Sequence, residues 1–257
     1  MTLKVPDRHN PKLQQLTELV NADAELLQLW KCANVNAVDR SGISDHGEVH
    51  VRIVANAALR ILRLLADGGI RPSVVTNYGL TAEDAEVIVT LGACLHDLGI
   101  AVSRDDHERY SLILALPKCR QLLAPLYAEP TLTVLVAEVL HTVIAHRWDV
   151  RCLTLEAGVV KVADALDMSQ GRSRIPFQAG QVNIHSLSAQ AIEAVAIEKG
   201  IEKPVRIAIT MHDSAGIFQV DELLKRKLVN STLAPYVEVV ASIAGDVNKQ
   251  LIEIYKH

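Results

Sequence analysis

The chain has 257 residues, of which 49% are hydrophobic and 22% are charged. This balance is typical of globular proteins and argues against a largely disordered chain, and the length suits one large domain or one domain with a smaller appendage. The formal net charge of −4 argues against the strongly basic surface that binds duplex nucleic acid non-specifically. A local basic pocket for one phosphate group remains compatible with it.

The cysteines and the apolar runs indicate the compartment. No CxxC pair is present, so the sequence does not suggest a thiolate metal site or a redox motif; the four cysteines are Cys32, Cys94, Cys119 and Cys152. The N-terminal segment MTLKVPDRHNPK lacks the apolar stretch of a secretory signal. No run approaches the ~18 uncharged apolar residues of a membrane span. We therefore expect a cytoplasmic protein without a membrane partner.

Residues 1–175 show the spacing of apolar residues that indicates successive helices. Thr81, followed by Asp84 three residues later, resembles a capping box and predicts the start of one of them. The expected helices cover roughly residues 12–34, 45–66, 82–97, 107–124, 131–147 and 154–169. The pattern predicts a mainly α fold, with a helical bundle over residues 1–175.

The pattern changes from about residue 176. Residues 205–211 (VRIAITM) alternate with period two, which predicts a half-buried strand. Residues 194–197 and 237–240 are shorter strand candidates, and residues 219–229 have helical spacing. We expect residues 176–257 to form a small α+β subdomain, through which the chain can form a homo-oligomer.

Four short segments place imidazoles and carboxylates inside apolar helical sequence. They contain His50, the adjacent pair His96-Asp97, His146 and Asp164. A vicinal His-Asp pair in an apolar run is costly unless both groups bind something, because a buried charge must be paired or coordinated. Imidazole suits Zn, Fe, Ni or Cu, and carboxylate also tolerates Mg or Mn. The set therefore predicts a buried divalent-metal site and leaves the metal open.

Helical phase, at about 100° per residue, ranks the neighbouring histidines. His50 shares its face with apolar residues and with His46, which we expect to be a partner or a cap more than a ligand. His141 and His146 lie about 140° apart on a helix, so they cannot readily face one site. Because His146 lies nearer the apolar arc, we expect it to face the site and His141 to matter little.

Other polar residues near these motifs allow two interpretations. Asp167 broadly shares the face of Asp164, and it either binds substrate or lies in solvent. His107 is either a surface histidine at a helix start or a second-metal ligand or phosphate contact. Arg172 and Arg174 follow the Asp164 helix directly. Since arginine forks match phosphate oxygens, we predict that both bind substrate phosphate; the alternative is pairing with surface carboxylates.

These motifs, in this order, resemble the HD-domain superfamily of metal-dependent phosphohydrolases. The signature of that family is a first His, a vicinal His-Asp and a distal Asp on a helical bundle. It is matched by HxxxVA at His50, LHDLG at 96–97 and VADALD around Asp164. The stretch from HDLG through IAHR to ADALDMSQGRSR is also similar to the HD domain of ribonuclease Y and to uncharacterised prokaryotic HD hydrolases. The resemblance covers about residues 44–175.

The resemblance implies a metal centre and a reaction. By position, the primary metal ligands would be His50, His96, Asp97 and Asp164. His107 and His146 match histidines that hold a second metal in dinuclear members, so one or two divalent ions are implied. Asp97 would bridge metal and water, and His107 or His146 would stabilise the phosphate or protonate the leaving oxygen.

The implied substrate is a small phosphate mono- or diester such as a nucleotide. The chain departs from many relatives at Ile100, where they have lysine in HDxGK, so one expected basic group near the phosphate is missing. Two alternatives stay open: a metal-stabilised ligand-sensing or regulatory module, and a mixed-valent di-iron oxygenase, which also occurs in this superfamily.

Overall fold

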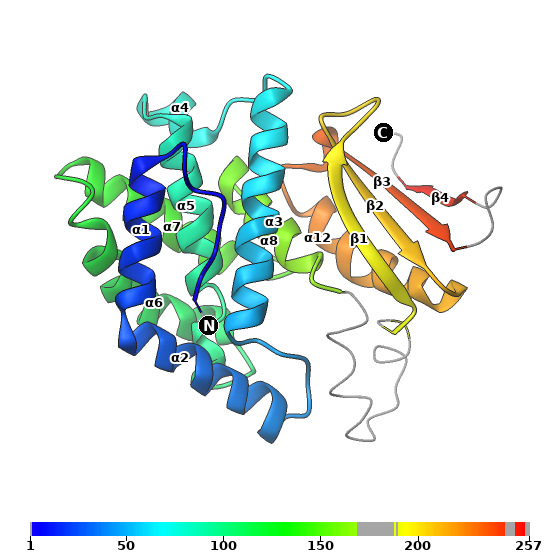
Figure 1. Ribbon diagram of the computed structural model, residues 1–257, viewed down its shortest axis with the longest axis horizontal. Helices are drawn as coiled ribbons and strands as arrows, with labels where there is room; N and C mark the ends of the chain where they lie inside the picture. The colour runs from blue at the N-terminus through cyan, green and yellow to red at the C-terminus, as the bar shows by residue number, and fades with distance from the viewer. Residues whose placement is uncertain (1, 169–187, 189, 245–249, 255–257) are drawn as a thin grey trace.

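The computed structural model describes residues 2–168, 188, 190–244 and 250–254. A bundle of helices packs beside a small four-stranded sheet (Figure 1). This arrangement confirms the predicted mainly α fold with an α+β appendage. The bundle is formed by α1 (Pro11–Ala22), α2 (Ala24–Asn34), α3 (Glu48–Asp67), α4 (Ser73–Tyr78), α5 (Ala82–Leu95), α6 (His107–Leu123), α7 (Thr131–Ala145) and α8 (Leu155–Ala165), with the short helices η1 (Val35–Arg40) and η2 (Leu98–Ala101).

Side chains that cap backbone N–H groups set the starts of several helices. The predicted capping box of α5 is present, because Thr81 Oγ1 accepts a hydrogen bond from Asp84 N at 3.3 Å and Asp84 Oδ2 accepts one from Thr81 N at 3.0 Å. Asn10 caps α1 and Thr154 caps α8 more simply, each by accepting one backbone hydrogen bond through its side chain. Each cap satisfies N–H groups that have no partner within the helix.

The segment predicted as one helix over residues 12–34 is two helices that meet at Asp23. Its extended backbone ends α1, and its Oδ1 accepts a hydrogen bond from Leu26 N at 2.9 Å to cap α2. The same carboxylate pairs with Lys118 Nζ at 2.8 Å. The prediction was wrong here because a single aspartate within an apolar periodic pattern is also a strong helix N-cap.

Helix α3 begins at Glu48, three residues later than expected. Asp45 Oδ1 accepts hydrogen bonds from Gly47 N at 3.2 Å and from His50 N at 3.3 Å, so its side chain caps the first turn. His46 precedes the helix, and its Nδ1 lies 2.6 Å from the Ser44 carbonyl oxygen. The argument from helical phase therefore applies to His50 and not to His46.

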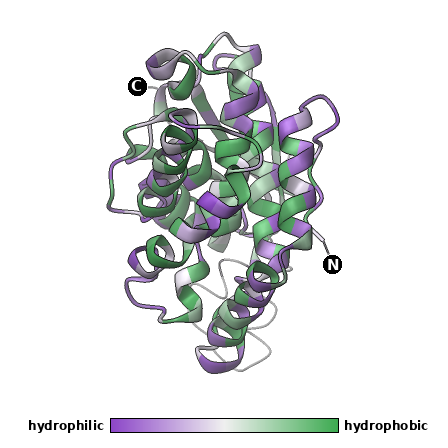
Figure 2. Cartoon of the chain, turned by 90° about the vertical axis from the view of Figure 1, so that its left-hand side faces the viewer, coloured by the Kyte–Doolittle hydropathy of each residue, from purple (hydrophilic) through white to green (hydrophobic). Residues whose placement is uncertain are grey.

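Helix α5 forms the centre of the bundle, and its residues from Asp84 to Leu95 are buried. It contacts α3, α7 and α8. Several of the surrounding helices have an apolar side and a polar side (Figure 2). A Cβ on Gly92 would lie 2.1 Å from Thr142 Oγ1, and a Cβ on Gly99 would lie 1.9 Å from the His107 carbonyl oxygen. These two glycines allow α5 and η2 to approach α7 and α6 closely.

The sheet has the strand order β1-β2-β3-β4, with β1 (Ile192–Lys199), β2 (Val205–Met211), β3 (Val237–Ile243) and β4 (Gln250–Ile254). β2 pairs antiparallel with β1 and parallel with β3, and β3 pairs antiparallel with β4. β2 coincides with the predicted strand and alternates in burial as expected. β1 and β3 are longer than predicted, and β4 was not predicted.

A helical crossover connects β2 to β3. It consists of η3 (Ser214–Gly216), α11 (Ile217–Gln219), η4 (Val220–Lys225), α12 (Arg226–Val229) and η5 (Ala234–Tyr236). Its buried residues Val220, Leu224 and Leu228 belong to the same apolar core cluster as the bundle and the sheet. α12 also contacts α8. The predicted boundary near residue 175 lies outside the described residues. None of the helices in the described part of the chain is long and apolar enough to cross a lipid bilayer.

Candidate metal centre

Five helices bring six histidine and aspartate side chains together. His50 lies in the first turn of α3, and His107 is the first residue of α6. His96 and His146 are the residues that end α5 and α7, and Asp164 lies in the last turn of α8. Asp97 follows His96. The structure thus gathers His50, His96, Asp97, His107, His146 and Asp164, the six residues predicted as metal ligands, and they form two groups that could each hold an ion.

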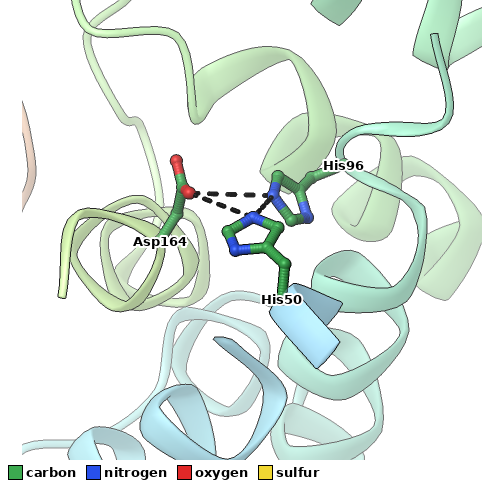
Figure 3. A group of neighbouring side chains, drawn as sticks. All are labelled: His50, His96 and Asp164. Atoms are coloured by element: carbon green, nitrogen blue, oxygen red, sulfur yellow. Dashed lines mark hydrogen bonds and ion pairs between the residues drawn. The ribbon is translucent and has the colours of Figure 1, made fainter. Parts of the chain in front are cut away.

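The first group consists of His50, His96 and Asp164, whose side chains point toward one another in Figure 3. The Nε2 atoms of His50 and His96 are 3.1 Å apart. Asp164 Oδ1 lies 3.4 Å from His50 Nε2 and 3.8 Å from His96 Nε2. Both imidazoles are fully buried, whereas the Asp164 side chain is 14% exposed. Asp164 therefore lies on the solvent side of this group.

The second group consists of Asp97, His107 and His146. The Nε2 atoms of His107 and His146 are 3.3 Å apart. Asp97 Oδ1 lies 3.3 Å from His107 Nε2 and 3.5 Å from His146 Nε2. The burial of His146 agrees with the helical phase. His141 is only partly buried, and its Nε2 accepts a hydrogen bond from Leu153 N at 3.0 Å.

Asp97 connects the two groups with its two oxygens. Oδ1 faces the His107 and His146 pair, while Oδ2 lies 3.3 Å from His50 Nε2 and 3.2 Å from His96 Nε2. Each Asp97 oxygen thus faces one pair of imidazoles, so this carboxylate could contribute a ligand atom at either pair.

In three of the histidines, a hydrogen bond donated by Nδ1 leaves Nε2 as the nitrogen that faces the cluster. His96 Nδ1 donates to the Ala93 carbonyl at 2.9 Å, and His146 Nδ1 donates to the Val143 carbonyl at 2.6 Å. In both cases a histidine at the end of a helix donates to a carbonyl three residues earlier, which has no partner in the helix. His50 Nδ1 donates to Asp167 Oδ2 at 2.7 Å.

His107 differs because Arg104 offers two contacts to its ring. His107 Nδ1 lies 3.0 Å from the Arg104 carbonyl oxygen and 3.0 Å from Arg104 NH1. The carbonyl suits a protonated Nδ1, and the guanidinium suits an unprotonated one. Its tautomer therefore depends on Arg104.

This donor set fits a divalent metal ion. Since Nδ1 carries the proton in His50, His96 and His146, their neutral rings present Nε2 lone pairs to the cluster, where the carboxylates are acceptors as well. Lone pairs at these separations repel one another unless a cation lies between them. Two nitrogens bound to one tetrahedral zinc ion lie about 3.3 Å apart, close to the 3.1 and 3.3 Å of the two histidine pairs.

The pKa shifts describe the charges of the cluster without metal. Burial opposes ionisation of Asp97, but the surrounding histidines, His96 foremost, hold its pKa well below the usual range. Burial also opposes ionisation of Asp164, and the ammonium of Lys227 is the main group that nevertheless holds its pKa well below the usual range. Burial lowers the pKa of His146, so its imidazole is held in the neutral form that binds metals. The Asp97 carboxylate outweighs the effect of burial on His107 and raises the pKa of that histidine.

The three residues predicted to bind substrate have different outcomes. Asp167 is buried against His50, which excludes the alternative that it lies in solvent. Its contact is with a ligand candidate, so it orients that imidazole, and its role toward substrate stays a prediction. Arg172 and Arg174 lie outside the described residues.

Sequence reasoning missed Lys227, which pairs through Nζ with Asp164 Oδ2. The lysine belongs to α12, between β2 and β3, and 63 positions separate it from Asp164. Its helical segment was predicted, but the pattern of that segment carries no signal for this contact. Only the packing of α12 against α8 reveals it.

Comparison with known proteins adds to this picture. A family model described as HD domain matches residues 48–169, which include all six cluster residues. An uncharacterised protein of Methanocaldococcus jannaschii, MJ1020, is 44% identical over 213 residues, which span 83% of this chain and 82% of that protein. No solved structure shows a significant match.

Proposed function

Because the chain belongs to the HD-domain superfamily, whose members are generally metal-dependent phosphohydrolases, we propose that it hydrolyses a phosphate mono- or diester of a small substrate such as a nucleotide. The observation that carries this proposal is the position of Asp97 between two pairs of imidazoles. Metal-dependent hydrolysis needs cations held rigidly beside a reactive water, and buried ligands oriented by Nδ1 hydrogen bonds provide that rigidity.

We assign His50, His96, Asp97 and Asp164 to the first ion. His107 and His146 would hold a second ion if the enzyme is dinuclear, and they would contact the phosphate group if it is mononuclear. When bound, a divalent ion polarises a phosphoryl oxygen and lowers the pKa of water to near ~7.

The residues of the chain fix the directions of the ligand atoms and keep bulk water away from the metal centre. Asp97 is anchored between four imidazoles, so both of its oxygens keep their direction. His50 and His96 are fully buried, which strengthens electrostatic interactions by keeping bulk water away. We further propose that Arg172 and Arg174, which follow α8 in the chain, bind the substrate phosphate. A cytoplasmic location suits the four free cysteines, since reducing compartments keep thiols free.

The test is to purify the full chain with its native metal, determine the metal content, and assay phosphate release from nucleoside monophosphates, cyclic nucleotides and dinucleotides. We expect one or two ions per chain and turnover of at least one phosphate ester that is lost with a chelator. The Asp97→Ala variant is the matched control for contaminating phosphatases.

Two results would contradict the proposal. Metal that stabilises folding without turnover of any ester would indicate a ligand-sensing module. Iron bound under anaerobic conditions, together with oxygen uptake on adding an organic substrate, would indicate a di-iron oxygenase.

A further inference from the structure

We propose that Lys227, supplied by the C-terminal α+β part of the chain, binds the phosphate group of the substrate at the edge of the metal centre. This inference rests on the proposed phosphohydrolase function and extends it to a residue outside the matched HD segment, which ends at residue 169. The ligand class is a phosphate monoester or its product, inorganic phosphate.

The two oxygens of Asp164 contact different partners, and this places Lys227 beside the imidazole pair. Oδ1 faces the Nε2 atoms of His50 and His96, and Oδ2 accepts a hydrogen bond from Lys227 Nζ. One carboxylate therefore separates the ammonium from the imidazole pair. A phosphate held at that pair lies next to Lys227.

The lysine lies on the side of the cluster that solvent can reach. The Asp164 and Lys227 side chains are 14% and 16% exposed, whereas those of His50 and His96 are fully buried. Asp164 and Lys227 are therefore more open to an incoming ligand than the imidazoles of His50 and His96.

Lys227 has donors left for such a ligand. An ammonium group has three N–H donors, and among the described residues Asp164 is its one hydrogen-bond partner. Two N–H groups stay available for phosphate oxygens, and lysine is a common phosphate-binding residue. A dianionic phosphate also needs this charge, because Asp97 and Asp164 are negative.

The adjacent basic residues of the same helical segment behave differently. Lys225 Nζ lies 3.6 Å from Asp221 Oδ1, and Arg226 NH2 lies 2.5 Å from Glu222 Oε2, so both pair within the segment. Lys227 alone of these three reaches to α8. Lys227 therefore points toward the metal centre because of its contact with Asp164, and not because the whole helical segment is basic.

The chain that follows α12 is attached to the helical bundle and fixes this direction. The Asn230 carbonyl accepts a hydrogen bond from Cys152 N at 3.0 Å, and Asn230 Nδ2 donates to the Trp148 carbonyl at 2.9 Å. Thr232 Oγ1 donates to the Thr154 carbonyl at 3.1 Å. Three hydrogen bonds within a few residues of Lys227 hold it against α8 without any contribution from the lysine itself.

The experiment measures two affinities of the full chain by calorimetry. Mn²⁺ is titrated into metal-free protein, and inorganic phosphate is titrated into the Mn²⁺-loaded protein. The variants are Lys227→Gln, Lys227→Arg and the matched control Lys225→Gln. We expect Lys227→Gln to weaken phosphate binding by about tenfold or more, the loss of one charge-assisted hydrogen bond. Its Mn²⁺ affinity should stay within a few-fold of wild type, because a glutamine amide can still donate a hydrogen bond to Asp164 Oδ2. Lys227→Arg should recover part of the phosphate affinity, and Lys225→Gln should match wild type.

Three results would overturn the inference. Wild-type protein that binds Mn²⁺ but no phosphate would do so, as would a Lys227→Gln variant with unchanged phosphate affinity. A parallel loss of Mn²⁺ and phosphate affinity would show that Lys227 only positions Asp164. In contrast, protein that binds phosphate through Lys227 but hydrolyses no ester would support this inference and reject the proposed hydrolase function.

Discussion

Replacing Asp167 tests how the centre is held together. Its Oδ2 accepts the Nδ1 proton of His50 at 2.7 Å, and both side chains are buried. Removing a carboxylate that orients a metal-binding histidine typically lowers metal affinity by about 10- to 100-fold, or about 1.4 to 2.7 kcal/mol. We expect a loss of this size in Asp167→Ala. Asp167→Asn should lose less, because its amide oxygen still accepts the proton but has no charge.

The assay is competition between the protein and a chromophoric chelator for Zn²⁺ or Mn²⁺, with Asp221→Asn as an exposed control. At saturating metal, the KM of Asp167→Ala for the best substrate should match that of wild type. Unchanged metal affinity together with a raised KM would refute this reasoning and restore the role that the sequence suggested, a direct contact between Asp167 and substrate.

Three further predictions concern the cluster and the core. Asp97→Ala should lose most of its bound metal in elemental analysis while its circular dichroism stays helical; full retention of metal would contradict the assignment. His146→Ala should lower turnover or second-metal occupancy more than tenfold. His141→Ala removes the hydrogen bond from Leu153 N, so it should cost on the order of 1 kcal/mol of stability without loss of metal. The opposite ranking would show that His141, and not His146, faces the metal centre. Burial and the nearby Glu156 raise the pKa of Glu138 above 4.5, so the folded protein loses stability as pH rises from about 4.5 through that raised pKa. Above this window Glu138→Gln should be more stable than wild type, by about 1.4 kcal/mol for each tenfold difference in proton affinity between the folded and the unfolded chain. Equal thermal midpoints of the two proteins at pH 4 and pH 8 would disprove the last prediction.

The sequence predicted the parts of the site that depend on periodicity. His146 was placed toward the core because the apolar arc of a regular helix determines its direction, and α7 is regular up to the residue before it. For Asp167 the same reasoning left substrate contact and solvent exposure equally open, because α8 ends at Ala165 and regular helical phase no longer applies two residues later.

Contacts between distant segments were beyond such reasoning. The pairing of Lys227 with Asp164 depends on how the crossover between β2 and β3 packs on the bundle, which no local pattern records. The break at Asp23 depends in part on Lys118, 95 residues further along the chain. In both cases a partner far away in the sequence decides the role of a charged side chain.

The helix ends that carry His96, His146 and Asp164 have a consequence for the stability of the whole protein. The carboxyl ends of α5, α7 and α8 each bring partial negative charge toward the centre, and Asp97 and Asp164 add two full charges. A cation bound between them interacts favourably with all of these charges. An ion that binds only the folded chain adds RT ln(1 + [M]/Kd) to the free energy of unfolding, about 2.7 kcal/mol at a hundredfold excess over Kd. The melting temperature should therefore follow the concentration of free metal, so that the supply of the ion sets the folded fraction of the protein.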